Sequence, residues 1–163
     1  MGIIKKCIVM CLSVALLLVS LNGCGKGNEA YTATEITDEI KAYNDSDIAW
    51  TKLNKEEISA YFGFSAENIS DLSVYINDDD ENYDIAAAFE FDSDDDMMSV
   101  IETLNKSLSA AADSFKNTSI TESEKIGNRV VLKNRNILVV AVSTNHKKIG
   151  NMLQEKGFIS VEK

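Results

Sequence analysis

One apolar stripe constrains the fold of this chain more than any other feature. Between residues 94 and 115, apolar side chains recur at alternating spacings of four and three, at Met97, Ile101, Leu104, Leu108, Ala111 and Phe115. This spacing puts them on one face of an α-helix of roughly 20 residues, about 30 Å long. The face has to be buried, either against a coiled-coil partner or against the domain's own sheet. We expect the sheet, because a sheet with an apolar face itself has to be covered.

Four segments have the alternating pattern of β-strands, and they form two pairs. Residues 72–76 and 85–91 flank a loop rich in turn-forming residues at 77–82, which predicts a hairpin. Residues 128–133 and 137–143 flank Asn134-Arg135-Asn136, which predicts a tight turn because Asn tolerates a positive φ. Val139–Val142 is apolar on both faces, so we expect its strand to be central.

Three N-cap residues, Thr34, Asn54 and Asn145, predict three shorter helices, and Gly63 and Gly157 predict where the second and third end. The first two are expected at 34–43 and 55–61, and the last has Ile149, Met152 and Leu153 facing inward. The resulting order predicts the α+β class. We expect one domain, 34–163, with a four-stranded antiparallel sheet of two hairpins joined by the long helix, and helices packed mainly on one face.

The first 23 residues have the layout of a secretory signal peptide. Lys5 and Lys6 precede a mostly apolar, uncharged run at 7–21, and small residues follow. The run is shorter than the about 20 residues that span a bilayer core. The alternative is a short membrane anchor that is not cut, but Asn22-Gly23-Cys24-Gly25 follows the run at once and favours cleavage.

Leu21-Asn22-Gly23-Cys24 resembles the lipobox of bacterial lipoproteins. The resemblance implies a diacylglycerol on the Cys24 sulfur, with cleavage making Cys24 the first residue of a protein held at the cell membrane on its extracytoplasmic face. Cys7 and Cys11 would leave with the signal peptide, so no free thiol would remain, which suits an oxidising compartment. Residues 24–33 are predicted to be the lipidated cysteine and a flexible tether.

The charge of the chain excludes nucleic acid as a partner. The formal net charge is −10, and loss of Lys5 and Lys6 would make the mature chain more acidic. Its only arginines are Arg129 and Arg135, whereas nucleic-acid binding requires a basic face. Such a charge repels anionic lipid and leaves the domain available to cationic partners.

Two acidic clusters are the best candidates for a metal site. Asp78, Asp80 and Asn82, and then Asp92, Asp94 and Asp96, each resemble the start of a Ca²⁺ loop. Neither continues with the Gly at the sixth place and the Glu at the twelfth that such a loop needs. The clusters bracket a strand, so they would lie more than about 20 Å apart. A solvated hairpin tip and a favourable helix N-terminus are the simpler interpretation, and His146 is expected to be a surface residue.

Several segments resemble a family of small bacterial cell-surface lipoproteins that carry a domain of unknown function. The resemblance runs from about Ile58 to Phe158 and rests mostly on packing motifs: Tyr61–Phe64, Leu72–Tyr75, Ile85–Phe89 with the Asp-led helix after it, Val130–Leu132 and Ile137–Ser143. In that family a Tyr-Pro pair often follows the long helix, and 117–123 contains neither residue. The resemblance implies an anchored extracytoplasmic domain and carries over no catalytic residue.

Function is less constrained by the sequence than location. It contains no nucleophile elbow or Ser-x-x-Lys motif in a meaningful context, so we expect a non-enzymatic binding or accessory module for an envelope protein or peptide, with no cofactor. Trp50 is a candidate contact residue, although packing over the core is its commoner role. The alternatives are a lipoprotein that binds a small molecule or a divalent cation, and an envelope hydrolase.

Substitution of Cys24 tests the predicted anchor. The Cys24→Ala variant should lose membrane attachment and appear as an uncut or soluble form, because two long acyl chains hold a protein at a bilayer almost permanently. Detergent phase partitioning of the wild type and the variant measures this. Recovery of the wild type in the aqueous phase would contradict the prediction.

Overall fold

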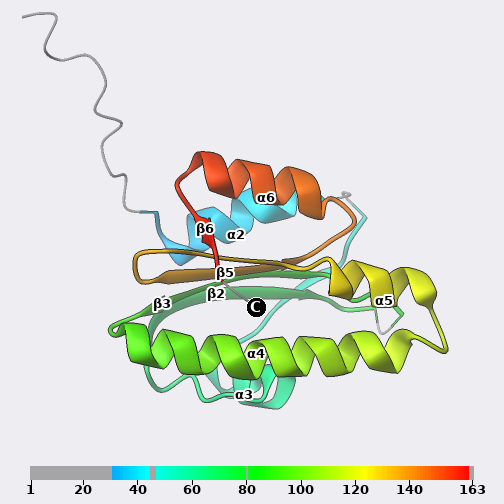
Figure 1. Ribbon diagram of the computed structural model, residues 1–163, viewed down its shortest axis with the longest axis horizontal. Coiled ribbons are helices and arrows are strands. Elements are labelled where there is room, and N and C mark those ends of the chain that lie inside the picture. Colours follow the sequence, from blue (N-terminus) through cyan, green and yellow to red (C-terminus); the bar gives the residue numbers. More distant parts are fainter. Residues whose placement is uncertain (1–30, 45–46, 80, 162–163) are drawn as a thin grey trace, which may run out of the picture. The chain divides into compact units, whose positions relative to one another are not determined.

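The computed structural model describes residues 31–44, 47–79 and 81–161 (Figure 1). This part of the chain contains five helices and six strands. In chain order they are α2 (Ala33–Ala42), β1 (Trp50–Lys52), α3 (Lys55–Phe62), β2 (Ile69–Asn77), β3 (Ile85–Phe91), α4 (Asp94–Phe115), α5 (Ile120–Gly127), β4 (Val130–Asn134), β5 (Ile137–Val142), α6 (His146–Glu155) and β6 (Ile159–Ser160).

The strands form one antiparallel sheet in the order β1-β2-β3-β5-β4-β6. Strands β3 and β5 are central and pair from Ile85 opposite Val142 to Glu90 opposite Ile137. The α+β class, the antiparallel pairing, both hairpins and the central place of β5 are therefore confirmed. The predicted strand number is wrong, because the short segments β1 and β6 extend the sheet from four strands to six.

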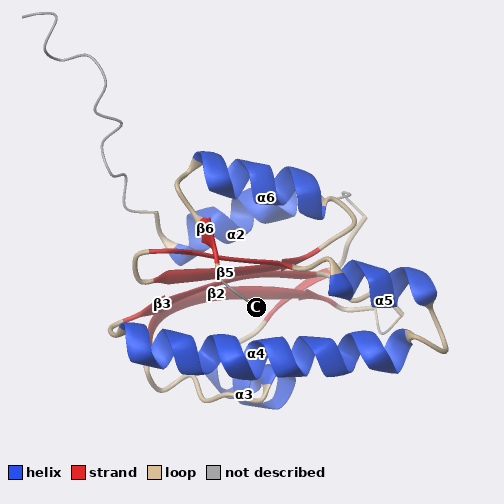
Figure 2. Ribbon diagram, in the orientation of Figure 1, coloured by secondary structure: helices blue, strands red, loops and turns tan. Residues whose placement is uncertain are grey.

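Helices cover both faces of the sheet, which corrects the predicted packing on mainly one face. Figure 2 shows α2 and α6 on one side of the strands and α3, α4 and α5 on the other. The reason lies in the two central strands, since every residue of β5, and all of β3 except Glu90, is buried. Apolar side chains therefore project from both faces of these strands, and each face needs its own layer of helices.

The face covered by α3 and α4 holds the larger core. The stripe predicted on α4 faces it: Met97, Leu104 and Leu108 are fully buried, with Ala111 and Phe115 partly buried against them. Phe89 of β3 lies edge-on to Phe62 and Phe64, with ring centroids 6.2 Å and 5.6 Å apart. The helix, its bounds and its inward face are confirmed.

The opposite face carries small side chains that allow α2 to pack closely against it. Ala86, Ala88 and Ala141 line it, and their small side chains let the helix lie close to the strands. Thr37 of α2 and Ser73 of β2, both fully buried, share a hydrogen bond of 2.7 Å between their hydroxyl oxygens. This bond fixes the helix over the sheet, because the buried Ser73 hydroxyl would be costly to leave unpaired.

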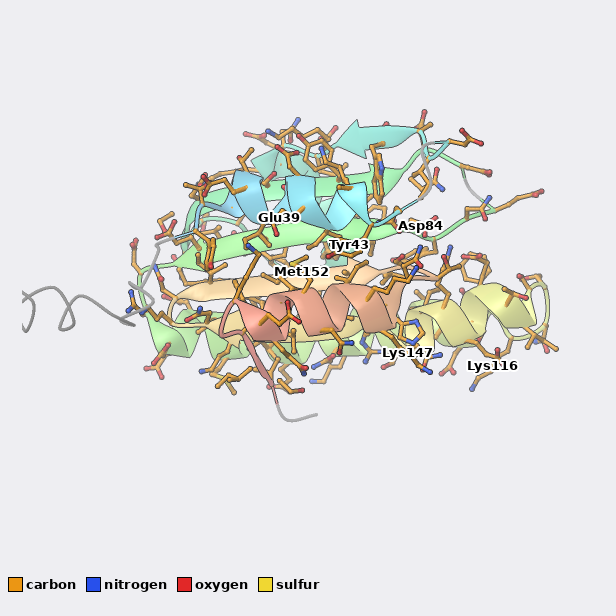
Figure 3. All side chains as sticks on the ribbon, turned by 90° about the horizontal axis from the view of Figure 1, so that it is seen from above. Glu39, Tyr43, Asp84, Lys116, Lys147 and Met152 are labelled. Carbon is orange, nitrogen blue, oxygen red and sulfur yellow. The ribbon has the colours of Figure 1, made fainter. Side chains whose placement is uncertain are left out.

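Helices α2 and α6 lie side by side in this layer. Figure 3 shows Glu39 on α2 and Met152 on α6 above the sheet. Lys156, just after α6, links the two helices through an ion pair of 3.0 Å with Glu39. Trp50 of β1 is half-buried against the same core. This packing is the commoner role expected for it.

Several local predictions need correction. Thr32, not Thr34, caps α2, because its hydroxyl and the Glu35 carboxylate close a reciprocal capping box. In the β4–β5 turn the positive φ belongs to Arg135, at 52°, not to an asparagine. Asn145 precedes α6 but makes no capping bond through its side chain. The prediction of α3 is confirmed, with Asn54 as its cap and Gly63 ending it in the left-handed region.

Gly63 provides a test of this helix end. Its φ is +80° and a Cβ would meet nothing within 4 Å, so Gly63→Ala should destabilise the domain by about 1 kcal/mol through backbone conformation alone. Gly127→Ala is the matched control, because that residue also has open space but no positive φ, and alanine favours a helix. Chemical denaturation measures both, and equal effects would contradict the argument.

Candidate functional site

The predicted lipidation residue, Cys24, lies outside the described residues, as do the predicted signal peptide, most of the tether and Asp80. In the described part of the chain, no helix is long and apolar enough to cross a membrane. The other candidate residues can be placed.

The first acidic cluster forms the β2–β3 turn. The Asp79 carboxylate accepts bonds from the Glu81 amide at 2.9 Å and from the Asn82 side chain at 2.7 Å. These bonds stabilise the charged form and lower the pKa of Asp79. Asp78 and Asn82 are exposed beside it. The sequence did not single out Asp79, which is the residue that organises this turn.

The second acidic cluster forms the N-terminus of α4, beyond the other end of β3. Ser93 caps the helix, and its hydroxyl donates to the Asp96 carboxylate at 2.6 Å. Asn68 donates to the other Asp96 oxygen at 2.8 Å, while Asp92 and Asp94 are exposed. Carboxylates in a first helical turn are favoured by the helix dipole. Among the residues with described positions, no three acidic, His or Cys side chains are grouped as a metal would require.

His146 was expected at the surface, but it is half-buried at the start of α6. Its Nδ1 atom is buried and has no hydrogen-bond partner in the structure. Lys147 and Lys148, which follow it, are exposed.

The structure brings together an ionic cluster that the sequence did not predict. Lys125 of α5 contacts Glu122 at 2.8 Å and Asp84 at 3.1 Å, and all three side chains are at least 91% buried, with exposed fractions of 5% for the lysine and 9% for each acid. Asp84 also accepts a bond from Asn77 at 3.1 Å, and Glu122 accepts one from the Tyr83 amide at 2.8 Å. The cluster fastens α5 to the β2–β3 hairpin.

Two tyrosines lie next to this cluster. The rings of Tyr61 and Tyr83 are stacked with centroids 6.0 Å apart. Burial is the largest cause that raises the pKa of both, and the nearby Tyr83 and Asp84 raise that of Tyr61 further. Both phenols are therefore neutral at physiological pH. The charges of the cluster are paired and the neighbouring tyrosines are neutral. The cluster is therefore suited to a structural role, which is to hold α5 against the β2–β3 hairpin.

In the described part of the chain, surface clefts lie at the edges of the sheet, and three of them bear on function. One, of about 390 Å³, follows the edge of β2 and is lined by Lys52, Leu53, Asn54, Lys55, Ser70, Asp71 and Leu72. A second, of about 400 Å³, lies by the β4–β5 turn and includes Asp94 and Arg135. The third, of about 190 Å³, borders β4 and includes Arg129. None of the three is lined by the ionic cluster, so binding at these clefts would involve other residues.

Comparisons with known proteins add no relative, since no family model, no curated protein and no solved structure matches the chain.

Substitution of Lys125 tests the role of the ionic cluster. Lys125→Met should destabilise the domain by about 3 kcal/mol or more, because it leaves two buried carboxylates uncompensated. Glu122→Gln in the same chain should recover part of the loss by removing one of those charges. The control is Lys106→Met, which breaks an exposed ion pair with Glu102 and should change stability little. Denaturation curves that do not separate Lys125→Met from this control would contradict the prediction.

Proposed function

We propose that this chain is a lipid-anchored binding module on the outer face of a bacterial membrane, without catalytic activity of its own. The Leu21–Cys24 motif after an apolar run supports the anchor. The observation that carries the binding role is the incompletely covered edge of β2. Its ligand is an extended peptide segment of an envelope protein, which adds to the sheet as a further strand.

Strand β2 is much longer than its outer neighbour. It has nine residues, whereas β1 has three and pairs only with Tyr75–Asn77. One more contact, from the Leu53 amide to the Val74 carbonyl at 2.9 Å, continues the pairing. Beyond Val74, the outer edge of β2 borders the cleft of about 390 Å³.

Backbone groups of β2 point into this cleft. The backbone N–H and C=O groups of successive residues point to alternate sides of an antiparallel strand. Those of Leu72 therefore point to the same side as those of Val74. A β-bulge between Ile69 and Asp71 turns Ile69 to that side as well. Leu72 therefore presents its amide and carbonyl to an incoming strand. Ile69 presents only its carbonyl, because its amide donates to the Ala66 carbonyl at 3.2 Å.

Side chains now occupy two of these backbone groups. The Leu72 amide donates to the Asp71 carboxylate at 2.9 Å, and Lys55 donates to the Ile69 carbonyl at 2.7 Å. Asp71 and Lys55 are exposed, so both can move aside for a peptide backbone that supplies the same bonds.

Two substitutions at the edge should act in opposite directions. Leu72→Pro removes the outward donor but no bond to β3, since proline is tolerated where the amide faces away from the ladder, and it should weaken peptide binding. Asp71→Ala frees the same amide and should strengthen binding. Peptides selected from a displayed library of random unstructured 10-residue sequences are the probe, measured by calorimetry.

Asp113→Ala is the control for the change in charge, because Asp113 is exposed on α4 and forms an exposed ion pair with Lys116. It should bind the selected peptides as the wild type does. Failure to select any peptide, or equal affinity for Leu72→Pro and the wild type, would contradict the proposed binding edge.

A further inference from the structure

Among the described residues, no acidic group neutralises the charge of Arg129. Arg129 lies between α5 and β4 and is half-buried. Its guanidinium donates to Asn105 at 3.2 and 3.3 Å, to Ser109 at 3.2 Å and to the Ile126 carbonyl at 3.4 Å. These partners are neutral, and no acidic side chain of the described residues forms an ion pair with Arg129. Burial accordingly lowers the pKa of Arg129.

The cleft of about 190 Å³ opens beside this guanidinium. It spans the sheet edge at β4, because it is bordered by Asn105 from the α4 side and by Gly150 and Gln154 from the α6 side. No acidic residue of the described chain lines it, although the chain has 26 acidic side chains against 16 basic ones. The bonds of Arg129 to described residues use four of its five N–H groups.

The remaining wall of the cleft combines apolar side chains with unused amides. Val130, Val131, Leu132 and Val161 supply the apolar surface. The Oδ1 atom of Asn105 accepts from Arg129, which leaves its amide nitrogen available, and the Gln154 amide is exposed. The cleft thus offers one cation, neutral donors and an apolar wall.

A glycine keeps the cleft open. Gly150 lies in the interior of α6, where glycine is less favourable for a helix than alanine. Packing does not require it, because a Cβ there would meet only the Val130 Cγ2 atom, at 3.9 Å, an ordinary contact. A longer side chain at this position would instead fill the cleft.

We propose that this cleft binds a small carboxylate with an apolar tail, held by the Arg129 guanidinium. A singly charged group matches the single cation, in a chain whose net charge of −10 disfavours multiply charged anions. The valine and leucine side chains accommodate the tail, and the Asn105 and Gln154 amides can donate to the second carboxylate oxygen. The site is on the opposite edge of the sheet from β2 and is independent of the peptide-binding proposal.

Titration of the isotope-labelled protein with sodium propionate tests this site by nuclear magnetic resonance. Propionate should cause saturable shifts at the amides of Val130, Val131 and Gly150. Propionamide, its neutral isostere, should cause none, and inorganic phosphate should bind at least tenfold more weakly. Shifts of equal size with propionate and propionamide would overturn the proposal, and tighter binding of phosphate would overturn the choice of a carboxylate.

Two sets of variants test separately the charge of the Arg129 guanidinium and the open space of the cleft beside Gly150. Arg129→Gln should raise the dissociation constant for propionate about tenfold or more, since a charge-assisted contact is lost. Arg135→Gln, the same change at an exposed arginine, should leave it unaltered. Gly150→Leu should abolish binding without touching Arg129, whereas Gly150→Ala should retain it. Equal affinity of Arg129→Gln and Arg135→Gln, or unchanged affinity of Gly150→Leu, would refute the site.

Discussion

Burial of β3 and β5 on both faces is the constraint on which the rest of this structure depends. Ala86–Phe89 and Leu138–Val142 are completely buried, and a strand in that position reaches no water through either face. The sheet must therefore lie between two layers of helices. The long helix α4 with α3 and α5 provides one layer, and α2 with α6 provides the other (Figure 2).

The same constraint explains why the open features lie at the sheet edges. The two faces are covered by helices, so the strand backbone that remains accessible lies at the edges, where it includes that of β2 beyond β1 and of β4 beyond β6. Strands β1 and β6 have three and two residues, too few to cover their neighbours. Both proposed binding sites use this difference in length, one at each edge.

Prediction from the sequence succeeded where several local signals agreed. The bounds of α4 and β3 followed from an apolar stripe, from partial alternation and from the polar residues between them. The predicted packing of helices mainly on one face was wrong, although Val139–Val142 is apolar on both faces. A strand of that kind implies two covered faces and therefore two layers of helices.

Helix α5 could not be predicted because its inward face is charged. Glu122 and Lys125 have the composition of a surface segment, and charged side chains are rarely buried unless paired. Their partner, Asp84, is 41 residues from Lys125 in the sequence, so only the fold shows the pairing. Arg129 and Gly150 are similar cases, since no spacing in the sequence indicates that they border one cleft.

The side chains of Lys55 and Asp71 have a consequence for the behaviour of many copies crowded on one surface. An uncovered strand edge is a template for association between identical molecules and for fibre growth. At the β2 edge such a contact would have to displace an ammonium and a carboxylate from the backbone groups they occupy. By occupying these backbone groups, the two side chains oppose aggregation through the β2 edge.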